Sequence, residues 1–266
     1  MLDEIKVCKT YKENKQISLN DIKKMFNINR YDLDRILSKN KIIKRKNQSK
    51  YIQKNRKLFF NEQFFLQKTP ETAYFMGFCL ADGSLFKPKN GNWTWYIGIH
   101  FKDFCIIKMF LKWLNLKNKD YYKYKYKRII RLTGHFFSKD FSNWGIVPNK
   151  TYEAVKPKII SKNLIKPFLI GLLDGDGSIS FDKKRGYKIS LVCNTKIIKW
   201  FIKTIKSLGY TEKVTLKKYS KKSWSRMIIS HKKGVISLVK ILKINKYQFI
   251  LNRKWKNIKN YLSNPV

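Results

Sequence analysis

One segment of this sequence occurs twice, and the repetition is the strongest constraint on how the chain can fold. The first copy reads ETAYFMGFCLADGSLF (71–86) and the second reads KPFLIGLLDGDGSISF (166–181). Each copy is an apolar run with helical character that ends in Asp-Gly-Ser and passes into residues typical of a β-strand. An internal repeat has to be recognised before a fold is assigned, and this one predicts two similar structural units.

The residues that follow the two copies also repeat their order. Each copy continues with a strand, a helix and a basic segment with strand character: 93–101, 104–116 and 121–132 in the first, and 187–194, 195–209 and 213–230 in the second. This order differs from the βαβ alternation of a Rossmann chain. It predicts an α+β fold, built twice, with antiparallel sheets.

Small residues lie four positions apart in both apolar runs: Gly77 and Ala81 in the first, Gly171 and Gly175 in the second. Residues at this spacing share one face of a helix, and small side chains there let two helix backbones approach closely. Glycine inside a helix costs about 1 kcal/mol relative to alanine, so its presence calls for a packing reason. We therefore expect the two helices to pack against each other.

Such packing would bring Asp82 and Asp176 side by side at the carboxyl ends of the helices. Each is followed by a glycine, Gly83 or Gly177, which we expect in the left-handed conformation that often ends a helix. Two carboxylates at the negative ends of two helix dipoles repel each other unless a cation lies between them. Mg²⁺ suits such an oxygen site and keeps water and phosphate oxygens as further ligands. The alternative is a pair of ordinary capped core helices.

The charge of the chain indicates its class of partner. Lys and Arg number 59 against 17 Asp and Glu, a formal net charge of +42 at pH 7. Proteins that tolerate such self-repulsion usually bind a polyanion. We find no apolar run near the roughly 18 residues that a membrane-spanning helix needs, and no apolar region of a secretory signal near the N-terminus. We therefore expect a soluble, intracellular protein that binds nucleic acid.

The cysteines and histidines exclude several kinds of site. The four cysteines include no CxxC pair, which argues against a disulfide scaffold or a zinc ribbon. The three histidines are dispersed and include no HxxxH array, so a histidine-based nuclease centre is not indicated.

Residues 17–44 predict two short helices with a tight break at Asn27-Ile28-Asn29. Their apolar faces are expected to consist of Ile22, Met25 and Phe26 in the first helix and of Leu33, Ile36 and Leu37 in the second.

These two helices resemble a helix-turn-helix, whose second helix commonly enters the major groove of DNA. That interpretation makes Arg30 and Arg35 candidate DNA contacts; an ordinary helical hairpin used for packing is the alternative. The stretch 44–57 that follows has five Lys, two Arg and no acid, and it reads as a solvated linker, a phosphate-tracking arm or both.

The segments FMGFCLADG (75–83) and LIGLLDGDG (169–177) resemble the two motifs of a single-chain LAGLIDADG homing endonuclease. The first departs from the motif because Leu80 stands where the earlier aspartate usually lies. The resemblance covers the chain from about residue 70 to the C-terminus. It implies an N-terminal extension (1–60) and two pseudo-symmetric αββαββα halves (68–156 and 157–266) whose sheets form a DNA-binding saddle.

The same resemblance implies a site-specific endonuclease that needs a divalent metal and cuts both strands of a long duplex. Asp82 and Asp176 correspond to the metal ligands, with two or more Mg²⁺ ions expected between the helices. A lysine in each half would support the chemistry, which points to Lys150 in GIVPNKT (145–151) and Lys254 in ILNRKWKNI (250–258). Asp103 and Asn194 lie where the family places a polar residue near the solvent network, although both could equally be plain N-caps.

Basic residues in the predicted sheets are the candidate DNA contacts. In YYKYKYKRIIRL, lysines alternate with tyrosines, so we expect one cationic strand face; a solubilising edge strand is the alternative. A two-stranded ribbon fits the major groove, where base edges can be read. The candidates are Lys87, Lys89, Asn90, Asn92, Lys123, Lys125, Lys127, Lys183, Lys184, Arg185, Lys188, Lys217 and Lys218.

Two rival functions use the same scaffold: an intron maturase that binds RNA, and a DNA-binding regulator. Retention of both Asp82 and Asp176 favours catalysis and intron homing, although a maturase can also keep them. We expect a monomer, because both half-sites lie on one chain.

Overall fold

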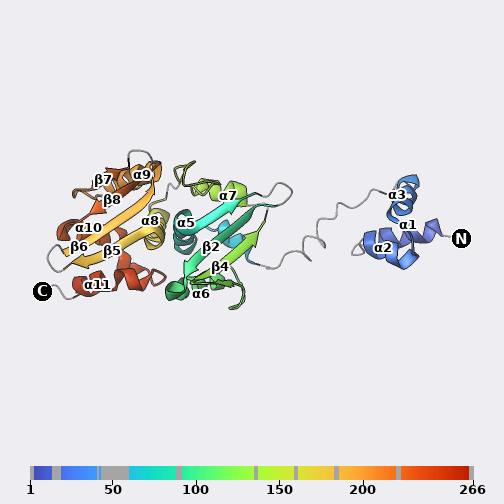
Figure 1. The fold of residues 1–266 in the computed structure, drawn as a ribbon, viewed down its shortest axis with the longest axis horizontal. Coiled ribbons are helices and arrows are strands. Elements are labelled where there is room, and N and C mark those ends of the chain that lie inside the picture. Colours follow the sequence, from blue (N-terminus) through green and yellow to red (C-terminus); the bar gives the residue numbers. More distant parts are fainter. Residues whose placement is uncertain are drawn as a thin grey trace. The chain divides into compact units, whose positions relative to one another are not determined.

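The structure of residues 1–266 is a computed structural model. It describes residues 3–13, 19–40, 42, 60–87, 92–134, 137–158, 161–182, 186–219 and 223–263. Contacts divide the chain into two units, residues 1–59 and residues 60–266 (Figure 1).

The N-terminal unit contains three helices: α1 (Glu4–Glu13), α2 (Leu19–Phe26) and α3 (Arg30–Lys39). The two helices expected from residues 17–44 are confirmed as α2 and α3. Asn27, in the break between them, has a left-handed backbone with φ 47°. Helix α1 was not predicted, and it completes a small core of Val7, Cys8, Tyr11, Leu19, Ile22, Leu33, Ile36 and Leu37.

Met25 differs from its expected position in this unit, and the two arginines proposed as DNA contacts are engaged within their own helix. Met25 was expected on the apolar face of α2, but it is 62% exposed, and Leu19 occupies the core instead. Arg30 and Arg35 each form an ion pair within α3, with Asp34 and Asp32 respectively.

The second unit contains two successive sets of elements in the same order. We call residues 60–158 the first half and residues 161–263 the second half. The first half contains α5 (Pro70–Asp82), β1 (Gly83–Phe86), β2 (Thr94–His100), α6 (Phe104–Trp113), β3 (Tyr122–Tyr124), β4 (Lys127–Thr133) and α7 (Phe137–Asn143), with short 3₁₀ turns at Glu62–Phe65 and Phe101–Asp103.

The second half contains α8 (Lys162–Asp176), β5 (Gly177–Asp182), β6 (Gly186–Asn194), α9 (Thr195–Ser207), β7 (Thr215–Lys218), β8 (Trp224–Ile229), α10 (Lys232–Leu242), a 3₁₀ turn at Ile244–Lys246 and α11 (Asn252–Ser263). The sheets have the strand orders β1-β2-β4-β3 and β5-β6-β8-β7, with every neighbouring pair antiparallel. The predicted fold class, two αββαββα halves with antiparallel sheets, is confirmed.

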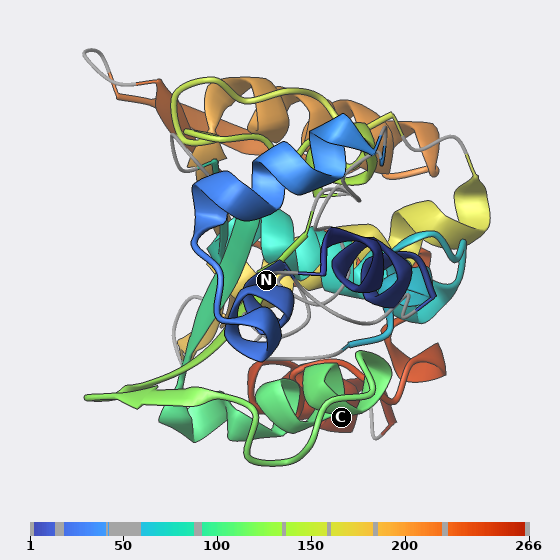
Figure 2. The ribbon, with the colours of Figure 1, turned by 90° about the vertical axis from the view of Figure 1, so that its right-hand side faces the viewer.

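Helices α5 and α8 pack side by side between the two sheets (Figures 1 and 2). A Cβ atom built on Gly77 would lie 2.0 Å from the carbonyl oxygen of Phe168, and one built on Gly171 would lie 2.1 Å from that of Tyr74. No side chain fits at either position, since backbone meets backbone there. The packing reason inferred for the small residues of the two motifs is therefore confirmed.

Each sheet buries one face and leaves the other open. In the first sheet, Trp95 and Ile97 of β2 lie opposite Leu132 and Ile130 of β4 on the buried face. Because side chains alternate along a strand, Tyr96 and its partner Arg131 lie on the open face. In the second sheet the open face carries Lys188, Lys217 and Arg226, and the cation Lys218 lies on the other side.

The single cationic strand face expected in 121–132 is wrong. Strand β3 ends at Tyr124, a turn follows in which Lys125 has φ 44°, and β4 begins at Lys127. In the resulting hairpin Lys123 lies opposite Arg128, whereas Lys127 lies opposite Tyr124. Neighbouring pairs of an antiparallel ladder point to opposite faces, so Lys123 and Lys127 do not share one. The alternation in the sequence continues through a turn that reverses the chain.

Candidate active site

Asp82 and Asp176 are the last residues of α5 and α8, and the two helices are still in close contact there. A Cβ atom built on Gly175 would lie 2.3 Å from the Cβ of Ala81 and 3.4 Å from Oδ2 of Asp82. Gly175 immediately precedes Asp176, so the carboxyl ends of the helices bring the two motif aspartates together. Within the described part of the chain, neither carboxylate accepts a hydrogen bond or joins an ion pair.

The glycines after the aspartates do not have the left-handed conformation that was expected. Gly83 has φ −75° and ψ 156°, and Gly177 has φ −78° and ψ 151°, both extended. Each helix passes directly into a strand, and the tight turn leaves no space for a side chain. A Cβ on Gly83 would lie 2.6 Å from the carbonyl oxygen of Cys79, and one on Gly177 would lie 2.3 Å from that of Leu173.

Burial raises the pKa of both aspartates above the ordinary value of a carboxyl group. The pKa of Asp176 rises to about 6, and the nearby charge of Asp82 adds to this increase, while Lys150 and Lys254 oppose it. The pKa of Asp82 is raised by burial and lowered by Lys150, Lys254 and Lys127. The site therefore concentrates negative charge at a place where a cation would be stabilised.

Lys150 lies in the turn-rich segment between α7 and α8, and its ammonium group reaches the carboxyl end of α5. Its Nζ donates hydrogen bonds to the carbonyl oxygens of Leu80 and Ala81. Burial lowers its pKa, while Asp176 and Asp82 raise it. Lys150 is the cation with the largest influence on the pKa of each motif aspartate.

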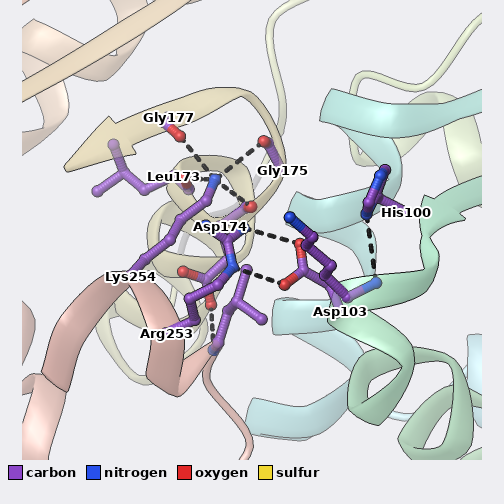
Figure 3. A network of polar contacts seen from close by, with 10 residues as sticks. His100, Asp103, Leu173, Asp174, Gly175, Gly177, Arg253 and Lys254 are labelled. Carbon is purple, nitrogen blue, oxygen red and sulfur yellow. Dashed lines mark hydrogen bonds and ion pairs between the residues drawn. The ribbon is translucent and has the colours of Figure 1, made fainter. Parts of the chain in front are cut away.

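Lys254 has the corresponding position at the end of α8 (Figure 3). From α11, its Nζ lies within hydrogen-bond distance of four carbonyl oxygens, those of Leu173 at 3.2 Å, Asp174 at 2.5 Å, Gly175 at 3.1 Å and Gly177 at 2.6 Å, which its three N–H groups share. The carbonyl groups at the end of a helix have no partners within the helix, so each lysine neutralises a negative helix end. The structure thus brings both candidate lysines to the two aspartates.

Asp174 is a buried site residue to which the sequence assigned no role. Its Oδ2 accepts hydrogen bonds of 2.8 Å from the Tyr74 hydroxyl and from the Leu251 backbone, and its Oδ1 accepts one of 2.6 Å from Trp255 Nε1. Leu251 and Trp255 flank Lys254, so this carboxylate fixes the start of α11. Its counterpart in the first motif is Leu80. The presence of Leu80 where the motif has an aspartate was the one sign in the sequence that the first half lacks this buried carboxylate.

Asp103 and Asn194, expected near the active site, each contact the segment that carries a lysine in the other half. Asn194 caps α9 by accepting from Lys196 N at 2.9 Å, and its Nδ2 donates to the carbonyl oxygen of Thr151 at 2.8 Å. Asp103 accepts two 2.8 Å hydrogen bonds from Arg253 and makes no side-chain cap bond (Figure 3).

Both residues occupy the N-cap position of the following helix, Asp103 for α6 and Asn194 for α9, but their positions relative to the preceding strand differ. Asn194 is the last residue of β6, and the last residue of β2 is His100. His100 Nδ1 accepts from Lys102 N at 3.2 Å, the same type of bond that Asn194 makes. The short 3₁₀ turn Phe101–Asp103 separates Asp103 from the end of β2, whereas Asn194 is both the last residue of β6 and the N-cap of α9.

A cavity of about 290 Å³ opens beside this site. Its lining includes Asp176, Lys150, Asn194, Cys193 and Trp224. Burial raises the pKa of the Cys193 thiol to about 12, with Asp176 adding to the increase, so this cysteine stays a neutral thiol.

The donors present fit a hard divalent cation in type, though not in number. Two carboxylates without hydrogen-bond partners are oxygen ligands of the kind that Mg²⁺ binds. Among the residues that the structure describes, no third Asp, Glu, His or Cys joins them to complete a set of ligands. Further ligands would therefore come from water or from the phosphate oxygens of a bound nucleic acid.

The predicted DNA contacts are distributed over the molecule. On the open sheet faces lie Lys127, Lys188 and Lys217, whereas Lys123 and Lys218 lie on the other faces. Lys87 is exposed, with its ammonium 5.9 Å from the Trp93 ring centroid, and Asn92 is half-buried. Lys89, Asn90, Lys183, Lys184 and Arg185 lie outside the described residues. No helix in the described ranges is long and apolar enough to cross a membrane.

Three solved structures illustrate what this fold is similar to. The LAGLIDADG homing endonuclease I-SmaMI bound to cleaved DNA is 13% identical, with a TM-score of 0.46 over 74% of this chain and 92% of that one. The LAGLIDADG meganuclease I-AabMI bound to uncleaved DNA is 13% identical, with a TM-score of 0.49 over 73% and 89%. The I-LtrWI LAGLIDADG homing endonuclease bound to target DNA is 14% identical, with a TM-score of 0.45 over 72% and 88%.

These three proteins are of the family that the two motifs resemble. Neither a protein-family model nor a curated protein sequence matches the chain.

Proposed function

We propose that this protein is a site-specific DNA endonuclease that requires a divalent cation and cuts both strands of a duplex. One observation carries the proposal: two carboxylates without hydrogen-bond partners meet at the packed ends of two helices, and a lysine binds each helix end. Each half of the protein thus contributes one aspartate and one lysine, and two such sets suit the cleavage of two strands. The net charge of +42 suits a DNA partner.

Asp82 and Asp176 would hold the cation, for which Mg²⁺ is the expected ion. When bound, it would polarise the scissile phosphate, lower the pKa of an attacking water and stabilise the leaving oxygen. The proximity of Lys150 and Lys254 keeps positive charge at the site, where negative charge develops in the transition state. Their hydrogen bonds to helix carbonyls fix the positions of both ammonium groups before DNA binds.

The open faces of the two sheets would bind the DNA. They carry Lys127 and Arg131 in the first half and Lys188, Lys217 and Arg226 in the second. Aromatic side chains lie between these cations: the Arg131 guanidinium, for instance, is 5.8 Å from the ring centroid of Phe86. Phosphate contacts would position the duplex, and side chains that reach base edges would select the sequence.

The decisive experiment is cleavage of a randomised duplex library in Mg²⁺ by the wild type and by the variants Asp82→Asn and Asp176→Asn. We expect double-strand breaks at a defined sequence with the wild type only, while duplex binding persists in both variants. Loss of folding can be checked by thermal unfolding. Tight duplex binding without cleavage by the wild type would refute the nuclease, and preference for RNA over DNA would favour the maturase alternative.

A further inference from the structure

A second, larger cavity lies at the other ends of α5 and α8. It has a volume of about 580 Å³, and its lining includes Pro70, at the start of α5, and Lys162 and Lys166, at the start of α8. With 13 residues in α5 and 15 in α8, and a rise of about 1.5 Å per residue, the two ends of these helices are about 20 Å apart. The cavity is therefore separate from the aspartates at the carboxyl ends.

Five lysines line this cavity, and no acidic residue does: Lys68, Lys162, Lys166, Lys243 and Lys246. They come from three separate parts of the chain, so their convergence is a product of the fold and not of one basic run. In the described part of the chain, no carboxylate lies within ion-pair distance of any of them. The pKa of Lys166 is lowered by burial and then by the charges of Lys243, Lys246 and Lys162.

Backbone features of the same cavity add to its positive character. The start of α8 faces it, and the N-cap residue Ser161 makes no side-chain cap bond there. The first N–H groups of a helix carry partial positive charge and bind anions readily.

Lys243 has a left-handed backbone, with φ 54° and ψ 46°, at the end of α10. Non-glycine residues adopt this conformation uncommonly, and asparagine does so more readily than lysine. The other described residues with positive φ are Asn27, Asn115 and Asn149, besides glycines and Lys125. Lysine at this position thus has a conformational cost, and its charge is what distinguishes it from the residues that would fit more easily.

We propose that this cavity is a second anion-binding site, which holds backbone phosphates of a nucleic-acid strand apart from any duplex on the sheets. Lysine ammonium groups from α8, the end of α10 and the segment before α5 bind the phosphates, and the N-terminal end of α8 faces the same anions. Contacts to backbone phosphates carry no sequence information, so this binding is independent of sequence. It does not depend on the nuclease activity, since it uses none of the residues at the carboxyl ends.

The test uses single strands of RNA and of DNA with the same sequence, about 20 nucleotides long, bound to the full-length protein. The cavity variant is Lys162→Gln, Lys166→Gln and Lys246→Gln. Its matched control is Lys112→Gln, Lys199→Gln and Lys203→Gln, three exposed helix lysines outside the cavity, so both proteins lose the same charge. Binding is followed by fluorescence anisotropy between about 50 and 200 mM salt.

The plot of log affinity against log salt has a negative slope, to which each phosphate contact contributes about 0.7 for a single strand. We expect the cavity variant, which lacks three lysines, to have a slope shallower by about 2. The control should lose less than half as much. A stronger effect for one kind of strand identifies that strand as the ligand. Equal losses in the two variants, or none in either, would overturn the proposal.

Two further measurements keep the test independent of folding defects. Lys243→Asn should raise the melting temperature, because asparagine accepts the left-handed backbone, and should still weaken strand binding. Acetylation followed by mass spectrometry should find Lys166 and Lys246 protected by the bound strand and Lys199 and Lys203 unprotected. Unchanged binding in Lys243→Asn, or uniform protection of all lysines, would contradict the assigned site.

Discussion

The carboxylate of Asp103 accepts two 2.8 Å hydrogen bonds from the guanidinium of Arg253, the residue directly before Lys254 on α11. Asp103 is only 13% exposed and belongs to the first half, whereas Arg253 belongs to the second. The pair therefore fixes the lysine of one half to the framework of the other (Figure 3).

Asp103→Ala should reduce cleavage through its effect on Lys254. Loss of the carboxylate leaves the Arg253 guanidinium unpaired and frees the start of α11. We expect a drop in single-turnover rate of about tenfold, equivalent to about 1.4 kcal/mol. Lys254 should become more reactive toward an acetylating reagent, while Lys150 should not change. A variant that slows cleavage but leaves the reactivity of Lys254 as in the wild type would disprove this route. Asp32→Ala, which breaks a surface pair in α3, is the control.

Asp174→Asn should destabilise the fold strongly. The wild-type carboxylate accepts from three donors in a buried site, and an amide cannot accept from all of them. We expect a loss of about 3 kcal/mol or more in the free energy of unfolding, against about 1 kcal/mol for Tyr74→Phe, which removes a single donor. Urea unfolding of the two variants measures both. A smaller loss for Asp174→Asn than for Tyr74→Phe would show that the network is not as described.

The stability contributed by Asp176 should fall as the pH rises. Its folded-state pKa of about 6 lies above the ordinary 3.8, so the folded state binds the proton more tightly than the unfolded state does. Protonation stabilises the fold, and that contribution is lost between about pH 4 and pH 6. At pH 7 the free energy of unfolding of Asp176→Asn should therefore exceed that of the metal-free wild type by up to about 3 kcal/mol, and its melting temperature should be higher. Near pH 4 the two proteins should not differ.

The same titration should affect cation binding. A proton on Asp176 competes with the divalent ion, so cleavage and Mg²⁺-dependent stabilisation should both decline below about pH 6. Thermal unfolding with and without Mg²⁺ across this pH range separates the two effects. Stabilisation by Mg²⁺ that persisted undiminished at pH 5 would count against Asp176 as a ligand.

Gly171→Ala should prevent normal packing of α5 and α8. The new methyl group would lie 2.1 Å from a backbone oxygen, which no rotamer change can relieve. We expect a loss of about 3 kcal/mol or more, beyond the usual range for a single substitution. Gly98→Ala is the matched control, because its Cβ would make ordinary contacts of 3.5 Å or more. Similar melting temperatures for the two variants would rule out the close packing.

The repeated motif made much of this fold predictable, and the reason is local. Short stretches of sequence contain each of the signals that were used: glycines at helical spacing, an aspartate at the end of each apolar run, and alternation of apolar and polar residues in the strands. The lysines were harder to assign, since lysine is abundant throughout. Lys150 and Lys254 were indicated only by the resemblance of their segments, 145–151 and 250–258, to those of the family. The roles of Asp174 and Arg253 escaped prediction because their partners lie far away in the sequence, at Tyr74 and Asp103.

Local pattern also failed where the backbone changed direction. The lysine–tyrosine alternation from Tyr122 to Lys127 has the period of a strand, but the chain turns at Lys125 and divides the lysines between two faces. In the same way the glycines after Asp82 and Asp176 suggested a helix-ending conformation. Their actual constraint is the space available beside Cys79 and Leu173, which depends on the strand that follows.

The crossed attachment of the two lysines limits how this chain can be divided. Thr151, next to Lys150, is held by Asn194 and Ser223 of the second half, and Arg253 at the start of α11 is held by Asp103 of the first. The residue equivalent to Asn194 in the first half is His100, which has no amide to donate. Two copies of either half would thus not rebuild the site, whereas the two different halves, made as separate chains, hold the parts each other needs.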